Sequence, residues 1–124
     1  MSGQLPLVVA ITGASGAVYG IEALKALKVA GFETHLILSN AAEQTIKLET
    51  GTPLGAVRTL AARIYDEDNI AAAISSGSFK TMGMLVAPCS IKTLSGIANS
   101  YADKLIVRAA DVSLKERRKL VLMV

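Results

Sequence analysis

The sequence predicts a doubly wound α/β domain built on a parallel sheet, and three observations lead to this fold class. Continuous apolar runs rich in β-branched residues alternate with segments whose apolar residues recur at helical spacing. A glycine-rich turn, TGASGAVYG at 12–20, directly follows the first apolar run. The 124 residues are 52% hydrophobic and 19% charged, which suits one compact domain with a real core. Strands that alternate with helices pair in parallel through right-handed crossovers.

The first apolar run, LPLVVAI at 5–11, carries no charged residue and predicts a strand buried on both faces of the sheet. The next segment, 15–31, predicts a helix that ends naturally at Gly31. The apolar positions that recur at helical spacing in it are Val18, Ile21, Leu24 and Leu27. A second buried strand is predicted at 33–39, where the sequence is ETHLILS.

The rest of the chain continues the alternation. Ser39 or Asn40 has the side chain to cap a helix over 41–51. The stretch 52–65 is less distinct, because VRTLAARIY within it fits either a turn of helix or a short strand. The elements predicted after it are a short helix at 66–78, a strand at 82–88, helices at 90–100 and 101–118, and a buried strand at 120–124. The sequence ends within this last strand, and we therefore expect it to be a truncated form.

Composition and charge exclude several classes of function. With a net charge of +3, three tyrosines, two phenylalanines and no tryptophan, the chain offers little to nucleic-acid bases. No apolar run approaches the roughly 20 residues of a membrane span, and the start, MSGQLPLVV, lacks the basic region of a secretory signal. One cysteine, Cys89, forms no internal disulfide, which predicts a cytoplasmic protein. The scarcity of aromatic residues favours a homo-oligomer, because small cores often gain buried area by association.

The ligand site is predicted at the carboxyl ends of the strands, where doubly wound sheets bind their ligands. Each of three predicted strand ends carries small residues or hydroxyl groups and leads into a helix: Thr12–Gly16, Ser39–Asn40 and Pro88–Thr93. Free backbone N–H groups and the helix dipole favour an anion at such a place. The sequence therefore predicts a phosphate site where these three ends meet.

The glycine spacing indicates which phosphate compound is bound. No lysine follows Gly16 or Gly20 as a Walker A loop requires, and the Gly-x-Gly-x-x-Gly of a dinucleotide site is absent. The second strand ends in Ser39-Asn40 rather than in the acidic residue that binds the ribose of NAD. The pattern thus favours a mononucleotide phosphate, although Gly13 and Gly16 also fit a plain tight turn.

Several candidate residues have a structural interpretation beside the functional one. Ser15, Ser90 and Thr93 fit helix caps as well as ligand contacts. Cys89 is more typical of a small buried residue than of a nucleophile, and His35, within the second strand, is interpreted as structural. A Ser-His-Asp triad is therefore not expected, and no group of residues has metal-ligand spacing.

Basic residues follow in the last predicted helix. Arg108 and Lys115 lie two helical turns apart, so they share a face that can hold a second phosphate. Arg117 and Arg118 fit solvated surface, as charged runs usually do.

Five segments of the chain, in this order and spacing, resemble the flavin prenyltransferases, formerly described as aromatic or phenolic acid decarboxylase subunits. The segments are AITGASGAVYG, LILSNAA, SGSF, LVAPCSIKTLSGIA and RAADVSLKERRKLVL. The resemblance spans the whole chain and implies a flavodoxin-like Rossmann fold with three α/β/α layers. Residues 1–124 then form a single FMN-binding domain, in a homo-oligomer that is a dodecamer assembled from trimers.

The resemblance also implies an activity. Members of this family transfer a dimethylallyl group from dimethylallyl phosphate to N5 and C6 of reduced FMN, without a metal. The prenylated FMN then passes to a partner decarboxylase that acts on aromatic (hydroxyarylic) acids. Basic side chains stabilise the departing phosphate, and holding the allyl group against the flavin lowers the entropic barrier.

Site residues follow from the resemblance position by position. Ser15 matches a serine near flavin N5 that takes part in the chemistry, and Arg108 and Lys115 match residues that hold the dimethylallyl phosphate. The residues that match FMN contacts are Gly13, Ala14, Ser15, Ser39, Ser90, Ile91, Lys92 and Thr93. Family members continue past the equivalent of Val124 into further substrate contacts. We therefore expect this chain to bind flavin and to turn over little or not at all.

Two alternatives remain at this stage. One is an FMN-binding flavoprotein or aromatic acid decarboxylase subunit without prenyl transfer, including the cysteine-decarboxylating type. That type uses a histidine in the helix after the first strand, and this sequence has none before His35. The other is a non-enzymatic assembly subunit in which the fold serves only packing.

Overall fold

The computed structural model describes residues 4–124, so the first residues of the segment MSGQLPLVV lie outside the described part. Five parallel strands form one sheet: β1 (Leu7–Ile11), β2 (Thr34–Leu38), β3 (Arg63–Asp66), β4 (Gly83–Val86) and β5 (Lys119–Leu122). The helices are α1 (Ala17–Val29), α2 (Asn40–Thr50), α3 (Leu54–Arg58), α4 (Ile91–Ala98) and α5 (Leu105–Lys115), with a 3-10 turn, η1 (Ala73–Ser75). The predicted doubly wound, three-layer α/β fold of the flavodoxin-like Rossmann class is confirmed.

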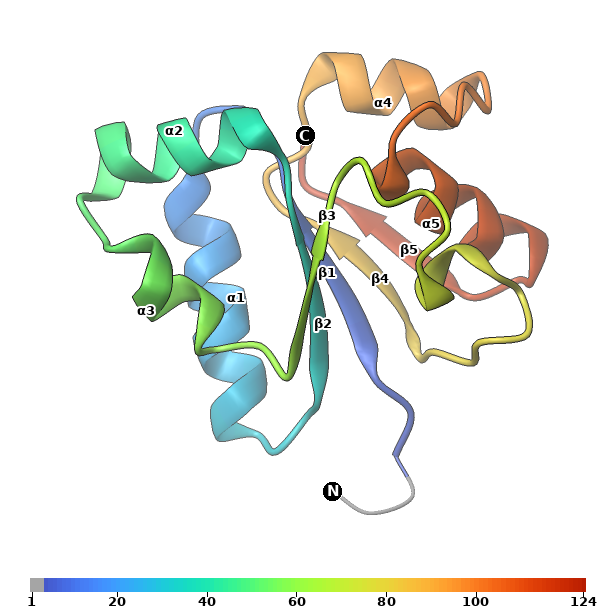
Figure 1. Ribbon diagram of the computed structural model, residues 1–124, viewed down its shortest axis with the longest axis horizontal. Helices are drawn as coiled ribbons and strands as arrows, with labels where there is room; N and C mark the ends of the chain where they lie inside the picture. Colours follow the sequence, from blue (N-terminus) through green and yellow to red (C-terminus); the bar gives the residue numbers. More distant parts are fainter. Residues whose placement is uncertain (1–3) are drawn as a thin grey trace.

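The strand order is β3-β2-β1-β4-β5, so β1 lies at the centre of the sheet. From β1 the chain moves outward to β2 and β3, then crosses to β4 and β5 on the other side. The order reverses between β1 and β4, which is the switch point where such sheets bind ligands. Figure 1 shows α1, α2 and α3 on one side of the sheet and α5 with η1 on the other.

The core has two halves, one on each face of the sheet. Alternate residues of β1 point to opposite faces, so Val9 and Ile11 pack with α1 and α2 whereas Val8 and Ala10 pack toward α5. Both faces of β1 are buried, as the continuous apolar run predicted. This rigid central strand fixes the position of the loop that follows it.

Four predictions about elements were wrong or incomplete. The stretch 52–65 holds both a helix and a strand, α3 and β3, so the sheet has five strands rather than four. In the predicted helix at 66–78, Asp66 ends β3, and residues 67–78 form a loop with one 3-10 turn instead of an α-helix. The last strand, β5, is a sheet edge on which Val121 is 48% exposed, because only β4 pairs with it in the described structure. On α1, Val18 is exposed and the buried face consists of Ala17, Gly20, Ile21 and Leu24.

Candidate functional site

A cavity of about 890 Å³ opens at the carboxyl ends of β1, β2 and β4. The three predicted strand ends all contribute to its wall, through Thr12–Ala14, Ser39–Ala41, Ser90, Lys92 and Thr93. The rest of the wall comes from Glu67, from α4, from the α4–α5 connection and from the first turn of α5. The convergence of the three strand ends predicted from the sequence is thus confirmed. The volume of the cavity lies in the usual range for cofactor sites.

Thr12 joins two of the three strand ends. Its side chain is buried, and Oγ1 donates to the carbonyl oxygen of Pro88 at 2.7 Å. The same oxygen accepts from the backbone N–H of Ser90 at 3.0 Å. The loop after β4 is therefore held against the end of β1, in the position where it lines the cavity.

The loop after β1 needs two glycines for different reasons. Gly16, the N-cap of α1, has φ of 103°, a left-handed conformation that favours glycine. A Cβ on Gly13 would lie 2.5 Å from the Cβ of Ala41, so only glycine lets this loop approach α2 so closely. Ser15, the predicted catalytic residue, lies between them and is exposed, but it does not line the cavity.

The N-terminus of α1 already holds a carboxylate. Glu49, from the end of α2, accepts from the backbone N–H groups of Gly16 at 3.0 Å and Ala17 at 3.2 Å. These two hydrogen bonds, with a smaller contribution from the Ser15 hydroxyl, hold the pKa of Glu49 below its ordinary value. Sequence reasoning missed Glu49, because nothing in the local pattern at 49 signals a partner more than thirty residues away.

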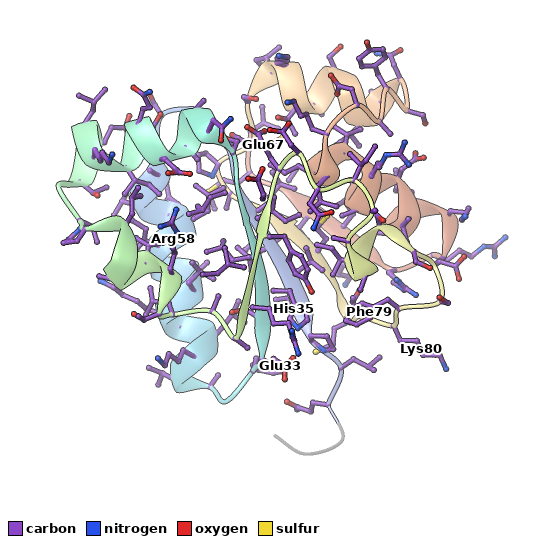
Figure 2. All side chains as sticks on the ribbon, viewed as in Figure 1. Glu33, His35, Arg58, Glu67, Phe79 and Lys80 are labelled. Carbon is purple, nitrogen blue, oxygen red and sulfur yellow. The ribbon has the colours of Figure 1, made fainter. Side chains whose placement is uncertain are left out.

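The N-terminus of α2 is also capped by the protein itself. Ser39 Oγ accepts from the N–H of Ala42 at 2.9 Å, which confirms the predicted cap. Glu67, in the loop after β3, accepts from the N–H of Asn40 at 2.7 Å through Oε2. Figure 2 labels Glu67 at the top of the sheet, beside the first turn of α2. Glu67 is the second residue of the site that sequence reasoning missed.

The N-terminus of α4 differs from the other two. Ser90 caps it by accepting from the N–H of Thr93 at 3.1 Å, and its hydroxyl donates to Thr93 Oγ1 at 2.9 Å. Within residues 4–124 no hydrogen bond engages the N–H groups of Ile91 and Lys92, and no carboxylate caps this helix. Lys92 also lines the cavity and adds a positively charged residue to this helix start. Of the helix starts of α1, α2 and α4, only the start of α4 has no carboxylate of the described residues bound to its N–H groups, and such a start favours an anion.

The two basic residues of α5 lie apart from this cavity. Arg108 and Lys115 are both exposed, and neither lines it. Arg118, by contrast, is not simply solvated surface as its charged run suggested. Its guanidinium donates to the carbonyl oxygens of Phe79 at 3.1 Å and Gly77 at 2.8 Å, and so fixes the SGSF loop.

The contacts of the single histidine indicate a structural role. His35 is buried near the amino end of β2, with Nδ1 3.0 Å from Tyr65 Oη and Nε2 2.8 Å from Glu33 Oε2. Figure 2 shows His35, Glu33 and Phe79 at the end of the sheet opposite Glu67. Burial raises the pKa of the Tyr65 hydroxyl and, separately, that of the Cys89 thiol. Cys89 is thus a buried thiol, as expected, and not an activated nucleophile.

The described residues hold no cluster of histidine, cysteine and carboxylate side chains that could bind a metal ion. Among residues 4–124 there is also no helix long and apolar enough to span a bilayer.

Comparison with known proteins gives consistent results. The model of the flavoprotein family matches residues 1–124. A flavin prenyltransferase of Escherichia coli K12 is 59% identical over 119 residues, which are 95% of this chain and 63% of that protein. One from Thauera aromatica is 53% identical over 117 residues, which are 94% of this chain and 60% of that protein. The chain thus spans about three-fifths of the length of these relatives.

Two solved structures superpose closely. The crystal structure of AnUbiX in complex with FMN and dimethylallyl pyrophosphate is 51% identical, with a TM-score of 0.94 over 96% of this chain and 63% of that chain. A dodecameric FMN-dependent UbiX-like decarboxylase of Escherichia coli O157:H7 is 52% identical, with a TM-score of 0.93 over 95% of this chain and 65% of that chain.

Proposed function

The chain belongs to the flavoprotein family, and from that premise we propose that it is the FMN-binding domain of a flavin prenyltransferase. The reaction proposed for it transfers a dimethylallyl group from dimethylallyl phosphate to reduced FMN. The observation that carries the proposal is the cavity where three strand ends meet beside the free N-terminus of α4. The relatives that are 53–59% identical, described as flavin prenyltransferases, support the same assignment.

The phosphate of FMN is proposed to bind at the start of α4. The N–H groups of Ile91 and Lys92, the Lys92 ammonium and the hydroxyls of Ser90 and Thr93 together offer donors and positive charge there. Gly13, Ala14 and Ser39 are proposed to contact the rest of the flavin, since they line the other walls of the cavity.

Bound reduced FMN would supply the nucleophilic ring atoms, and the protein would bind and orient the allyl donor. Ser15 is proposed to act near flavin N5. Arg108 and Lys115 are proposed to stabilise the phosphate that departs when the allylic C–O bond breaks. Because both are exposed on α5 outside the cavity, we propose that they serve the cavity of a neighbouring copy in a trimer or dodecamer. The dodecameric assembly of the E. coli O157:H7 neighbour supports that arrangement.

The product, prenylated FMN, is proposed to pass to a partner decarboxylase that acts on aromatic acids. A cytoplasmic location is proposed with it, on the ground that the single cysteine forms no internal disulfide.

The proposal is tested first by titrating the chain with FMN and following flavin fluorescence. We expect saturable quenching at about one flavin per chain, because one cavity is large enough to hold it. Lys92→Ala should weaken FMN more than riboflavin, since riboflavin has no phosphate. Lys47→Ala is the matched control, because Lys47 lies on α2 and does not line the cavity. A folded chain that binds no flavin would refute the assignment.

Transfer itself is tested with reduced FMN and dimethylallyl phosphate under anaerobic conditions. The product would be a flavin heavier by one C5H8 unit, since the allyl group replaces a hydrogen, and mass spectrometry should detect little or none of it from residues 1–124 alone. In a full-length chain, Arg108→Ala should abolish this product and leave FMN binding intact. FMN binding without any product by a chain extended to the full length of the relatives would instead favour the flavoprotein without prenyl transfer.

A further inference from the structure

The starts of α1 and α2 already hold the protein's own carboxylates. Glu49 occupies the N–H groups of Gly16 and Ala17, and Glu67 occupies the N–H of Asn40. Of these two carboxylates, only Glu67 belongs to a residue that lines the cavity. A ligand phosphate that entered the cavity toward α2 would therefore meet a negative charge beside an Asn40 N–H that is already bonded.

Glu67 is fixed in this place from two sides. Its carboxylate binds the start of α2, and its own carbonyl oxygen accepts from the N–H of Leu105 at the start of α5, at 2.7 Å. Lys104, which also lines the cavity, forms its ion pair with Asp68 and interacts with the charge of Glu67 over a longer distance. Among residues 4–124 Glu67 forms no direct ion pair, so its carboxylate presents a negative charge at the cavity wall.

The size of the cavity does not itself restrict the ligand to one phosphate. At about 890 Å³ it lies near the upper end of the range for small-molecule sites, so a flavin with a second phosphate is not excluded by volume. If the site distinguishes a flavin with one phosphate from a flavin with two, the charge of the cavity wall must do so. Two like charges closer than the Debye length of about 8 Å are only partly screened, so a second phosphate beside Glu67 would be repelled.

We propose that Glu67 is a specificity-determining residue, whose carboxylate at the start of α2 restricts the cavity to flavins with a single phosphate and rejects a diphosphate flavin such as FAD. The inference rests on the proposed function for its ligand class. Two effects act together. The Asn40 N–H is no longer available as a donor, and the carboxylate repels the second phosphate.

The test separates the charge of Glu67 from its hydrogen bond. Glu67→Gln keeps an oxygen that accepts from Asn40 but removes the charge, whereas Glu67→Ala removes both. Glu43→Gln is the matched control. Glu43 lies in the first turn of the same helix and pairs with Arg58 at 3.5 Å, but it does not line this cavity.

Dissociation constants for FMN, FAD and riboflavin are measured by fluorescence titration for each protein. In Glu67→Gln the ratio of the FAD constant to the FMN constant should fall by about tenfold, equivalent to about 1.4 kcal/mol. Riboflavin binding should stay unchanged, and so should all three constants in the control. An unchanged ratio in Glu67→Gln overturns the proposal. Equal weakening of all three flavins also overturns it, because Glu67 would then only hold the wall in place.

A second measurement does not depend on flavin binding. Inorganic pyrophosphate is titrated into the 15N-labelled chain, and backbone amide shifts are followed. In the wild type the signals of Ile91 and Lys92 should move while that of Asn40 stays. In Glu67→Ala, which removes the charge and frees the Asn40 N–H, the Asn40 signal should move as well. If the amide signal of Asn40 shifts equally in the wild type and the Glu67 variant, the proposal fails. If flavins do not bind but this pattern holds, the proposed function fails and the role of Glu67 stands.

Discussion

Replacing Gly20 by alanine tests the close packing of α1 against the sheet below the candidate site. Gly20 lies on the buried face of α1. A Cβ built there would lie 2.3 Å from the carbonyl oxygen of Ala87 and 2.8 and 2.9 Å from Cγ1 and Cδ1 of Ile11. Because carbon and oxygen approach no closer than about 3.3 Å without strain, the helix must shift by about 1 Å.

The expected cost combines two opposing terms. Overpacking in a core costs about 1–3 kcal/mol, and the upper end applies because a backbone oxygen cannot rotate away. Alanine regains about 1 kcal/mol of helix propensity over glycine. The free energy of unfolding should therefore fall by about 2 kcal/mol, or roughly 8 °C in Tm for a domain of this size.

Urea and thermal unfolding measure the effect, with Gly55→Ala as the matched control. Gly55 also lies in a helix, α3, but a Cβ there meets nothing within 4 Å. That variant should gain up to about 1 kcal/mol from propensity alone, so the two changes have opposite signs. Flavin binding should weaken in Gly20→Ala only, because Ala87 and Ile11 directly precede the two strand ends that Thr12 joins.

A Gly20→Ala protein as stable as the wild type would refute this reasoning. It would mean that α1 does not approach the Ala87 carbonyl as closely as the structure has it. Destabilisation of both glycine variants to the same extent would also refute it, since a general effect of alanine would then replace the steric one.

Three further predictions concern the loops around the cavity. Glu49→Gln should lower the free energy of unfolding at neutral pH, because the lowered pKa of Glu49 means that its ionised carboxylate stabilises the folded state. The difference in stability between wild type and variant should persist above pH 4.5, the ordinary pKa of the group, and shrink as acid protonates Glu49 in the wild type. Urea unfolding midpoints measured against pH test this. Cys89, only 2% exposed and with a pKa raised by burial, should react slowly with a thiol reagent until denaturant unfolds the chain, and fast labelling of the folded protein would contradict this. Thr12→Val should cost about 1–3 kcal/mol by leaving the Ser90 N–H without its acceptor, and hydrogen exchange at Ser90 should speed up in this variant but not in Thr12→Ser.

Much of the fold was predictable from the sequence because its signals are local. The buried runs around β1, β2 and β4 are continuous and apolar, and Ser39 and Ser90 cap helices a few residues away. Capping depends on residues within one turn, so the sequence is sufficient to predict it. The convergence of the strand ends also followed, because carboxyl ends of parallel strands meet at one edge of a sheet.

The elements that were missed lie at the edges of the sheet. β3 has four residues, RIYD, and three of them are exposed, so it lacks a buried strand's apolar run. The segment that follows β3 carries capping residue types but forms only the turn η1. In both places pairing or packing with distant residues decides the structure, which local propensity does not predict.

The residue pattern is sufficient to predict β1, β2 and β4, the helices that follow them, and the meeting of three strand ends at one edge of the sheet. Which helix starts carry a carboxylate from elsewhere in the chain is a property of the packed fold. Glu49 and Glu67 lie about 30 residues from the helix starts that they cap. Each accepts a backbone N–H that the local pattern of glycines and hydroxyls predicts to be unbonded. Hydrogen bonds between distant residues depend on the packed fold, and among residues 4–124 they leave the N–H groups of Ile91 and Lys92 at the start of α4 without a partner.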